Sequence, residues 1–449
     1  MIEKKYLVMG LGLHGGGLGV AKWLAEQGHP VLITDLKNQR ELAASLAPLK
    51  KFKNITYRLG QHQLSDFQNA AVVIANPSVR QDNKYLLAAK KVKAKIYNDL
   101  SFFLTLCPCP VIGITGTKGK STTATLIYQL LKTGQKKKVY LGGNIRISPF
   151  SFLSKLTTQD LVVLEFSSWQ CEGLKSIKYS PSVAILTNVG QDHLNTYKNF
   201  TAYRNAKLLL FKYQTKKDWA IINRDDRASQ QATGFIVGKI KKFSLSHGDN
   251  YVKNNYLYYQ QRKLMSIDQL KLTGQYNIAN MIAALYVAQI YHLSLARVRI
   301  ILKNFSGLPG RRQLIRVWQG RKFVNDTTAT SPLATITSLQ SSQQPIILIA
   351  GGMDKSLSYN QLAKTIQQKV DFLLLLPGSA TDKIKPLLKR LSYKKYQEVS
   401  SLAAAVKIAK QKSKPTYTIL LSPAAASFNL FINEFDRGDQ FNKLVNQKP

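Results

Sequence analysis

Short runs of apolar residues alternate with longer amphipathic stretches along the whole chain. A short apolar run that leads into a stretch of helical periodicity is typical of a parallel β-strand followed by an α-helix. Repetition of this unit predicts an α/β fold built on parallel sheets, and breaks in the pattern predict three domains, residues 1–108, 109–310 and 311–449. The predicted strands are Tyr6–Met9, Val31–Thr34, Ala71–Ala75, Val111–Ile114, Leu161–Leu164, Val183–Leu186, Ile346–Ala350, Phe372–Leu376 and Tyr417–Leu421.

Prolines, glycines and cysteines mark the two predicted boundaries. Prolines alternate with Cys107 and Cys109 at the first boundary, and two glycines surround a proline at residues 307–310. The chain has only three cysteines, which argues against a disulfide framework and for a reducing compartment such as the cytoplasm. One residue between Cys107 and Cys109 is not the spacing of a zinc site, so we interpret this stretch as a rigid linker that holds no metal.

Charge and apolar content limit the classes of protein that fit. Of the 449 residues, 45% are hydrophobic, which suits folded domains rather than a disordered chain. The 64 Lys and Arg against 24 Asp and Glu give a net charge of +40, but the excess is spread along the chain and forms no basic arm. We therefore expect no specific binding of nucleic acid. No apolar run reaches the roughly 18 residues of a membrane span, so we expect a soluble protein.

The first glycine-rich segment directly follows the strand Tyr6–Met9. Its glycines have G-x-G-x-x-G spacing, a helix predicted at Val20–Gln27 follows, and Asp35 ends the next strand. Such glycines let backbone N–H groups and a helix N-terminus approach a diphosphate, and the carboxylate can meet ribose hydroxyls. The segment predicts binding of a nucleotide diphosphate; a nicotinamide-dependent oxidoreductase and a tight turn without a ligand are the alternatives. The candidate residues are Gly10, Gly12, Leu13, His14, Gly15 and Asp35.

The second glycine-rich segment, residues 115–122, lies between the strand Val111–Ile114 and a helix predicted at Thr123–Leu131. This order is typical of a phosphate-binding loop, in which backbone N–H groups surround the phosphates, Lys120 reaches the β- and γ-phosphate oxygens and Ser121 can ligate Mg²⁺. Together with the basic composition, the loop leaves a nucleic-acid-dependent ATPase as a further alternative. The candidate ATP-binding residues are Gly116, Thr117, Lys118, Gly119, Lys120, Ser121 and Thr122.

Two further strands end at side chains that could bind a metal. Glu165 follows Leu161–Leu164, at the edge of the sheet where ligands of α/β folds bind, and is the main candidate for Mg²⁺. His193 comes soon after Val183–Leu186 and could ligate a second cation. A solvated carboxylate and a structural histidine are the alternatives.

At these motifs the chain resembles the Mur ligase family, the ATP-dependent amide ligases of peptidoglycan precursor synthesis. The loop 115–122 is similar to the family's ATP loop, with Lys118 where most members carry Asn. The resemblance spans the chain and implies an N-terminal Rossmann-like nucleotide-sugar domain, a central P-loop ATPase-like domain and a C-terminal Rossmann-like amino-acid domain. Further matching segments are residues 142–144, 165–170, 192–193, 203–207, 274–280 and 325–326.

Within the family, the first domain and the ending Leu421–Ser427 are most similar to members that add D-glutamate to UDP-N-acetylmuramoyl-L-alanine. The resemblance implies that ATP and Mg²⁺ convert a substrate carboxylate into an acyl phosphate, which the amine of D-glutamate attacks, and that the chain acts as a monomer. Thr328 stands where these members often carry lysine, and the aromatic Phe435 is shifted by one position. A Mur-type ligase for a different amino acid is therefore the closest alternative.

The resemblance also implies which residues hold each ligand. Lys207 would be carbamylated, which turns a cation into an anionic oxygen ligand for a second Mg²⁺; from the residues alone it is one lysine of many on an exposed helix. The implied catalytic residues are Lys120, Glu165, His193 and Lys207, and the implied metal ligands are Ser121, Glu165, His193 and Lys207. Further implied residues are Asn277, Asn280, Arg311 and Asp326 for ATP, the first glycine cluster with Asp35, Asn144, Ser167 and Gln170 for the UDP-substrate, and Thr330, Lys355 and Ser427 for D-glutamate.

Overall fold

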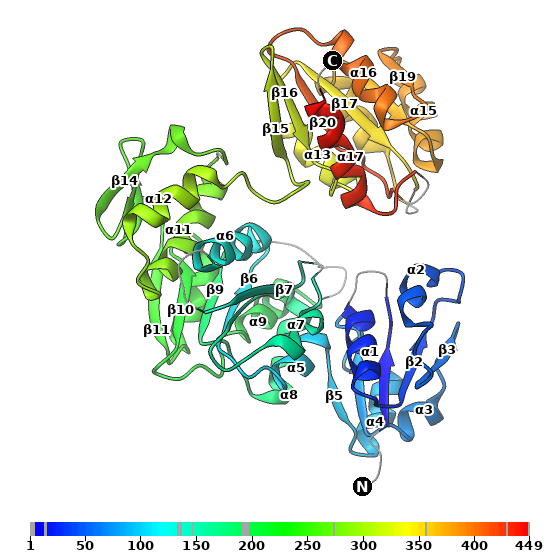
Figure 1. Ribbon diagram of the computed structural model, residues 1–449, viewed down its shortest axis with the longest axis vertical. Helices are drawn as coiled ribbons and strands as arrows, with labels where there is room; N and C mark the ends of the chain where they lie inside the picture. Colours follow the sequence, from blue (N-terminus) through cyan, green and yellow to red (C-terminus); the bar gives the residue numbers. More distant parts are fainter. Residues whose placement is uncertain are drawn as a thin grey trace. The chain divides into compact units, whose positions relative to one another are not determined.

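The computed structural model describes residues 5–12, 16–132, 137–145, 147–190, 197–272, 274–354, 357–427 and 430–447. The chain forms two compact units, Met1–Phe305 and Ser306–Pro449, each built on parallel strands covered by helices (Figure 1). The boundary between the units falls beside the predicted break at residues 307–310. The division of the first unit into domains 1–108 and 109–310 stays a prediction.

The N-terminal sheet has five parallel strands in the order β3-β2-β1-β4-β5. The sequence predicted β1, β2 and β4, but it missed β3 and β5, because exposed polar positions interrupt their apolar pattern. Helix α1 begins at Gly16 rather than at the predicted Val20, because three of its first four residues are glycines, which do not indicate a helix in the sequence. The bounds are β1 Tyr6–Met9, α1 Gly16–Glu26, β2 Val31–Asp35, α2 Ala43–Leu46, η1 Ala47–Leu49, β3 Ile55–Leu59, α3 Leu64–Gln68, β4 Val72–Ala75, α4 Lys84–Lys91, β5 Lys95–Tyr97 and α5 Asp99–Leu104.

The central sheet has six parallel strands in the order β11-β10-β9-β6-β8-β7. Strands β6, β8 and β9 are buried along their whole length, as their unbroken apolar sequences predict. The bounds are β6 Val111–Thr115, α6 Lys120–Lys132, β7 Val139–Gly143, η2 Pro149–Ser151, η3 Leu153–Lys155, β8 Leu161–Glu165, α7 Ser168–Glu172, α8 Leu174–Ile177, β9 Val183–Leu186, α9 Phe200–Leu208, β10 Trp219–Asn223, α10 Arg227–Gln230, η4 Gln231–Gly234 and β11 Lys239–Phe243.

A small antiparallel sheet, in the order β12-β13-β14, follows the central sheet in the sequence and leads into two helices. Helix α11 is buried over most of its length because it is apolar on nearly every side, and it packs against α6. The bounds are β12 Tyr251–Lys253, β13 Tyr256–Tyr259, β14 Arg262–Ser266, η5 Ile267–Gln269, α11 Gln275–Ile290 and α12 Leu295–Asn304.

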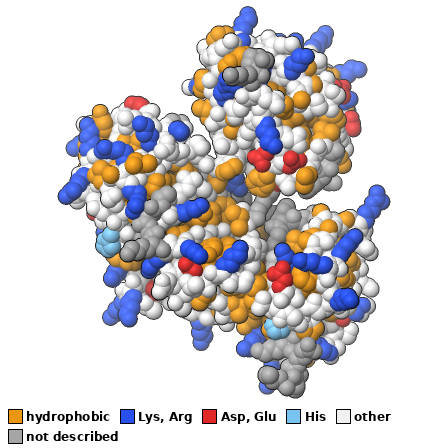
Figure 2. Space-filling model, in the orientation of Figure 1, with side chains coloured by type: hydrophobic (Ala, Val, Ile, Leu, Met, Phe, Trp, Pro, Cys, Tyr) orange, Lys and Arg blue, Asp and Glu red, His pale blue; other side chains and the backbone are white. Residues whose placement is uncertain are grey.

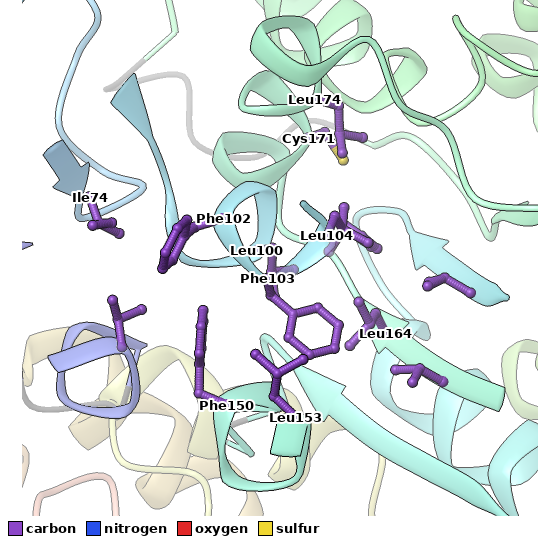
Figure 3. Close-up of a cluster of buried hydrophobic side chains, with 14 of the residues drawn as sticks. Ile74, Leu100, Phe102, Phe103, Leu104, Phe150, Leu153, Leu164, Cys171 and Leu174 are labelled. Carbon is purple, nitrogen blue, oxygen red and sulfur yellow. The ribbon is translucent and has the colours of Figure 1, made fainter. Parts of the chain in front are cut away.

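A continuous apolar core joins the N-terminal and central sheets. It includes Ile74 of the first sheet, Leu164 of the second, and Phe103 of the short helix α5 between them (Figure 3). Phe103 is fully buried, and its ring meets those of Phe150 and Phe152 edge to face. The two sheets therefore form one compact unit, because they share this core, although each sheet also packs against a buried cluster of its own.

The second unit has one six-stranded sheet in the order β15-β16-β20-β17-β18-β19, in which only the β15–β16 pair is antiparallel. The predicted strands β17, β18 and β20 form its buried centre, and the missed strands β15, β16 and β19 lie toward its edges. The bounds are β15 Gln313–Trp318, β16 Arg321–Asn325, α13 Pro332–Gln340, β17 Ile346–Gly351, α14 Asn360–Lys369, β18 Phe372–Leu376, α15 Ser379–Arg390, β19 Tyr396–Glu398, α16 Leu402–Lys412, β20 Thr418–Leu421 and α17 Glu434–Asn446.

One face of the surface shows how the excess of positive charge is distributed. On the face shown in Figure 2, Lys and Arg side chains are scattered among neutral ones and do not gather into a single stripe. This distribution agrees with the expectation that no basic arm stands apart from a neutral body. Among the described residues, no helix is both long enough and apolar enough to cross a membrane.

The shared core predicts that Phe103 stabilises both sheets of the first unit. We expect Phe103→Ala to lower the free energy of unfolding of this unit by about 3–5 kcal/mol, because it leaves a cavity against two other rings. Urea unfolding followed by tryptophan fluorescence measures the loss. The control is Leu106→Ala, at a side chain that is 39% exposed, which should cost less than about 1 kcal/mol. Equal costs for the two variants would show that the shared core does not hold the unit together.

Candidate active site

The loop between β6 and α6 contains two glycines that have no room for a side chain. Gly116 has a φ of +151°, and a Cβ there would lie 1.9 Å from Thr187 Oγ1. Gly119 has a φ of +85°, and a Cβ there would lie 2.2 Å from Asn280 Oδ1, which belongs to α11. Only glycine adopts such conformations at this packing density without strain. The structure thus brings three predicted ATP-binding residues, Gly116, Gly119 and Asn280, to one place.

Part of this loop is bonded to the protein itself. Asn188 accepts a hydrogen bond from Thr117 N through its backbone oxygen, at 2.9 Å, and one from Lys118 N through Oδ1, at 3.0 Å. Helix α6 begins at Lys120, so the N–H groups of its first turn precede the hydrogen-bond ladder of the helix and point toward the loop. The part of the loop that suits a phosphate is therefore residues 119–122, at the N-terminus of α6. The N–H groups of Thr117 and Lys118 instead hold the loop in its conformation through their bonds to Asn188.

Two lysine side chains donate hydrogen bonds to the same backbone oxygen of the loop, that of Gly116. Lys120 Nζ donates to Gly116 O at 3.0 Å and to Thr117 O at 3.1 Å. Lys207 Nζ donates to the same Gly116 O at 2.8 Å and lies 4.5 Å from the centroid of the Tyr203 ring. The expectation that Lys207 lies on an exposed helix is wrong, because Tyr203, Ala206 and Lys207 share the buried face of α9 and Lys207 is 2% exposed.

Glu165 lies at the end of β8 beside this loop and is 2% exposed. Its Oε1 accepts a hydrogen bond from Asn144 Nδ2 at 2.9 Å, while its Oε2 is buried with no hydrogen-bond partner in the described part of the chain. A buried carboxylate oxygen without a partner is costly unless a cation or a donor meets it. Oxygen is the ligand that Mg²⁺ prefers, so Glu165, with the Ser121 hydroxyl at the start of α6, fits a magnesium ion.

The described part of the first glycine cluster, residues 10–12, directly follows β1. Gly12 N donates to Asp35 Oδ2 at 3.2 Å, and Lys37 N donates to Asp35 Oδ1 at 2.9 Å, so Asp35 fixes this segment from the end of β2. The sequence reasoning missed Gly17, where a Cβ would lie 2.4 Å from Gly10 O. The three consecutive glycines at residues 15–17 could have indicated that the backbone at Gly17 lies close to that of Gly10.

Ser167 and Gln170 form a capping box at the start of α7, in which each side chain bonds the backbone N–H of the other. Gln170 Nε2 also donates to both carboxylate oxygens of Asp99, at 3.2 and 3.1 Å, although Asp99 belongs to α5. Burial raises the pKa of the Asp99 carboxyl, and the hydrogen bond from Gln170 opposes that shift. The sequence reasoning missed Asp99, because a carboxylate in the first turn of a helix is usually a solvated capping residue.

In the second unit, predicted residues lie at the carboxyl ends of the neighbouring strands β16 and β20. Asp326 is buried and accepts hydrogen bonds from Arg312 N at 3.1 Å and from Ser422 Oγ at 2.8 Å. Burial raises the pKa of the Asp326 carboxyl. The Oγ of Ser427 is buried without a partner among the described residues, so it can accept or donate to a ligand there.

Arg437, on α17, is a buried cation near these strand ends that the sequence reasoning missed. It is fully buried and donates to Thr327 Oγ1 at 3.0 Å, Thr327 O at 2.9 Å and Ala425 O at 3.3 Å. The sequence did offer one indication that Arg437 is buried. It lies four residues before Phe441, and residues at this spacing share one face of a helix. Thr328 donates to Gly310 O at 2.9 Å through its Oγ1.

The remaining predicted residues divide into two groups. Asn277 lies in the first turn of α11, Arg311 lies just before β15, and Thr330 lies just before α13. Five predicted residues fall outside the described residues: Leu13, His14, Gly15, His193 and Lys355.

Comparisons with known proteins identify the family. The model of the Mur ligase middle domain matches residues 114–288, and that of the Mur ligase MurD-like N-terminal domain matches residues 4–98. The UDP-N-acetylmuramoylalanine–D-glutamate ligases of Borreliella afzelii (strain PKo) and Clostridium tetani (strain Massachusetts / E88) are 39% and 35% identical to the chain. Each alignment covers at least 98% of this chain and at least 96% of the relative. The chain belongs to the Mur ligase family.

Solved structures of Mur ligases share the fold. UDP-N-acetylmuramate-alanine ligase from Thermotoga maritima matches with a TM-score of 0.59 at 20% identity, covering 98% of this chain and 99% of that one. The MurF ligase of the same organism, in complex with ADP, matches with a TM-score of 0.53 at 18% identity, covering 92% of this chain and 95% of that one. The predicted α/β fold class is thereby confirmed.

Membership of the Mur ligase family also decides between the enzyme classes that the motifs left open. Mur ligases are ATP-dependent ligases that use Mg²⁺, so the phosphate-binding loop and Glu165 have a place in their chemistry. A nicotinamide-dependent oxidoreductase would leave that loop without a role, and a nucleic-acid-dependent ATPase would not require the N-terminal domain. Both alternatives are therefore excluded.

The close approach at Gly119 predicts a specific effect on nucleotide binding. We expect Gly119→Ala to weaken binding of a magnesium complex of a non-hydrolysable ATP analogue by at least about tenfold, because its Cβ displaces the loop or Asn280. Isothermal titration calorimetry measures the Kd. Gly60→Ala is the matched control, because Gly60 has nearly the same φ, +84°, but no atom within 4 Å of a Cβ. The same Kd for both variants would contradict the contact with Asn280.

Proposed function

We propose that this chain joins D-glutamate to UDP-N-acetylmuramoyl-L-alanine, with conversion of ATP to ADP and phosphate, in the synthesis of peptidoglycan precursors. The observation that carries the proposal is the match, over nearly the whole chain, to ligases named for this reaction. The phosphate-binding loop beside a buried carboxylate supports it independently, since ATP and Mg²⁺ need both groups.

The proposed reaction has two steps. The carboxylate of the nucleotide-sugar substrate attacks the γ-phosphorus of ATP, which breaks the bond to the β-phosphate oxygen and gives an acyl phosphate and ADP. The amine of D-glutamate then attacks the acyl carbon, the bond to phosphate breaks, and the amine loses a proton. Phosphoryl transfer needs mainly positioning and charge neutralisation, so no nucleophilic side chain is required.

The chain's own groups would supply these two requirements. The first turn of α6 and Lys120 would hold the phosphates, for which Lys120 has to leave Gly116 O and turn toward the ligand. Ser121 and Glu165 would hold Mg²⁺, which neutralises charge on the phosphate oxygens. Asn280, packed against Gly119, would keep the loop in the conformation that exposes residues 119–122.

We propose a second Mg²⁺ site, held by His193 and a carbamylated Lys207. A carbamate at Lys207 would keep one N–H group that can donate to Gly116 O, and it would add two oxygens able to bind a cation. It would also remove one of the two positive charges that meet at this carbonyl oxygen. The burial of Lys207 supports the proposal, because a solvated lysine would gain nothing from the modification.

The other ligands would use residues from both units. The turn of Gly10 and Gly12, with Asp35, would bind the UDP part of the substrate, and Asn144 would orient it beside Glu165. Thr330, Lys355 and Ser427 would bind D-glutamate, for which Ser427 offers a buried hydroxyl. Because one chain carries residues for all three ligands, we propose that it acts as a monomer, and its free cysteines suit the cytoplasm.

The test of the function is a coupled measurement of phosphate release and product mass. The full chain is incubated with ATP, Mg²⁺ and UDP-N-acetylmuramoyl-L-alanine, and single amino acids are added in turn. We expect phosphate release only with D-glutamate, and a product heavier than the substrate by one glutamate residue. Release only with another amino acid would retain the ligase reaction but overturn the proposed specificity. No release with any amino acid would overturn the function.

Lys207 provides a sharper prediction about the second metal site. We expect Lys207→Ala to lower kcat by at least about 100-fold, because the carbamate's charge near the transferred phosphoryl group is lost. Short-chain carboxylic acids should restore part of the rate by occupying the vacated space, whereas bicarbonate should not. Lys212→Ala, at an exposed lysine after α9, should behave like the unmodified enzyme. Full activity of Lys207→Ala would refute the carbamate.

A further inference from the structure

Two cysteines face each other in the connector between the N-terminal and central sheets. Cys107 Sγ and Cys109 Sγ lie 3.7 Å apart, and Cys107 Sγ also lies 3.6 Å from Cys109 O. The connector is held at both ends by backbone bonds, from Cys107 N to Phe103 O at 2.9 Å and from Val162 N to Pro110 O at 3.1 Å. The two sulfur atoms therefore approach each other within a backbone that is held on both sides, and they have to move from 3.7 Å to about 2 Å to form a bond.

The two thiols differ in the properties that decide reactivity. Cys107 is partly exposed and Cys109 is buried. The contact between the two sulfur atoms lowers the pKa of Cys107 and raises that of Cys109. Thiolate character and access favour Cys107 as the attacking group, and its neighbour lies ready as the resolving group.

We propose that Cys107 and Cys109 form a reversible disulfide with low-molecular-weight disulfides as the oxidant, so that this connector is a site of redox modification. The Cys107 thiolate attacks one sulfur of the small disulfide, which releases one small thiolate and leaves a mixed disulfide on Cys107. The Cys109 sulfur, losing its proton to the second leaving thiolate, then attacks Cys107 Sγ and releases it. In total the protein loses two protons and two electrons, which is the loss of two hydrogen atoms, and the small disulfide takes them up and becomes two thiols.

The backbone around the pair makes the proposed disulfide easy to reduce again. Each of the two cysteines precedes a proline, which restricts its backbone to extended conformations. A disulfide between them would also close a small ring, because only Pro108 lies between the two residues. Strain of this kind makes a disulfide more oxidising and more labile than a structural one. The pair would thus stay reduced in an ordinary cytoplasm and close when the small-disulfide pool becomes oxidised, which reconciles it with a chain that otherwise has no disulfide framework.

The experiment uses the reduced, folded full-length chain, with oxidised glutathione as the probe. After incubation the remaining thiols are alkylated, and intact mass and peptide mapping locate each modification. We expect the unmodified sequence to lose two hydrogen atoms at Cys107 and Cys109 and to regain them with dithiothreitol. Cys171 serves as an internal control, because it is fully buried and burial raises its pKa to about 12, so it should remain a free thiol.

Three variants separate the two steps. Cys109→Ser should accumulate glutathione on Cys107, since the resolving thiol is absent, and Cys107→Ser should react at least about tenfold more slowly than Cys109→Ser. Cys171→Ser should form the disulfide like the unmodified sequence. A stable glutathione adduct on Cys107 of the unmodified sequence, or two unreacted thiols, would overturn the proposal. These outcomes do not depend on the ligase function, and the result for the unmodified sequence stands even if a variant does not fold.

Discussion

The geometry of the candidate site depends on one carbonyl oxygen, that of Gly116. Lys120 and Lys207 both donate to it, so their two ammonium groups lie closer than the ~6 Å within which charges perturb one another strongly. Such a pair of cations attracts anions, and either a bound phosphate or an anionic carbamate would relieve the repulsion. The carbonyl oxygen points to both lysines because Gly116 has a φ that other residues avoid and because Thr187 leaves no room for a side chain.

Packing around the loop holds that arrangement in place. Asn280 fills the space beside Gly119, Asn188 bonds the N–H groups of Thr117 and Lys118, and the buried α11 packs against α6. A loop constrained on three sides has little conformational freedom to lose when a ligand binds. The buried Glu165 Oε2, which has no partner in the part of the chain that the structure describes, adds the complementary charge. The backbone of the loop and Glu165 are therefore in place before any ligand is present, whereas the Lys120 side chain has to turn from Gly116 O toward the phosphates.

The sequence predicted the centres of the three large sheets and the positions of the two glycine-rich segments, because those features are local, but it missed the antiparallel sheet β12-β13-β14. Apolar runs such as Phe372–Leu376 are buried on both faces and stand out from their surroundings, and the glycine spacing follows from backbone conformation. Strands with exposed positions, such as β3, contain polar residues and therefore do not differ in hydrophobicity from the segments around them. The contacts of Lys207, Asp99 and Arg437 were not predictable in the same way, because each depends on a partner that is distant in the sequence. Burial of a charged residue is decided by tertiary packing, which periodicity alone describes only weakly.

Gln170 shows how such distant contacts change the interpretation of a predicted ligand-binding residue. Its Oε1 accepts from Ser167 N, and its Nε2 donates to Asp99, so both ends of the amide are already bonded within the protein. Asn98, the residue before Asp99, donates in turn to the backbone oxygen of Gln170. These bonds tie α5 to α7 across the junction of the N-terminal and central sheets, where Phe103 supplies the apolar contact. A substrate that bridges the two sheets needs their edges at a fixed separation, so a contribution of Gln170 to substrate binding would come as much from fixing that separation as from direct contact.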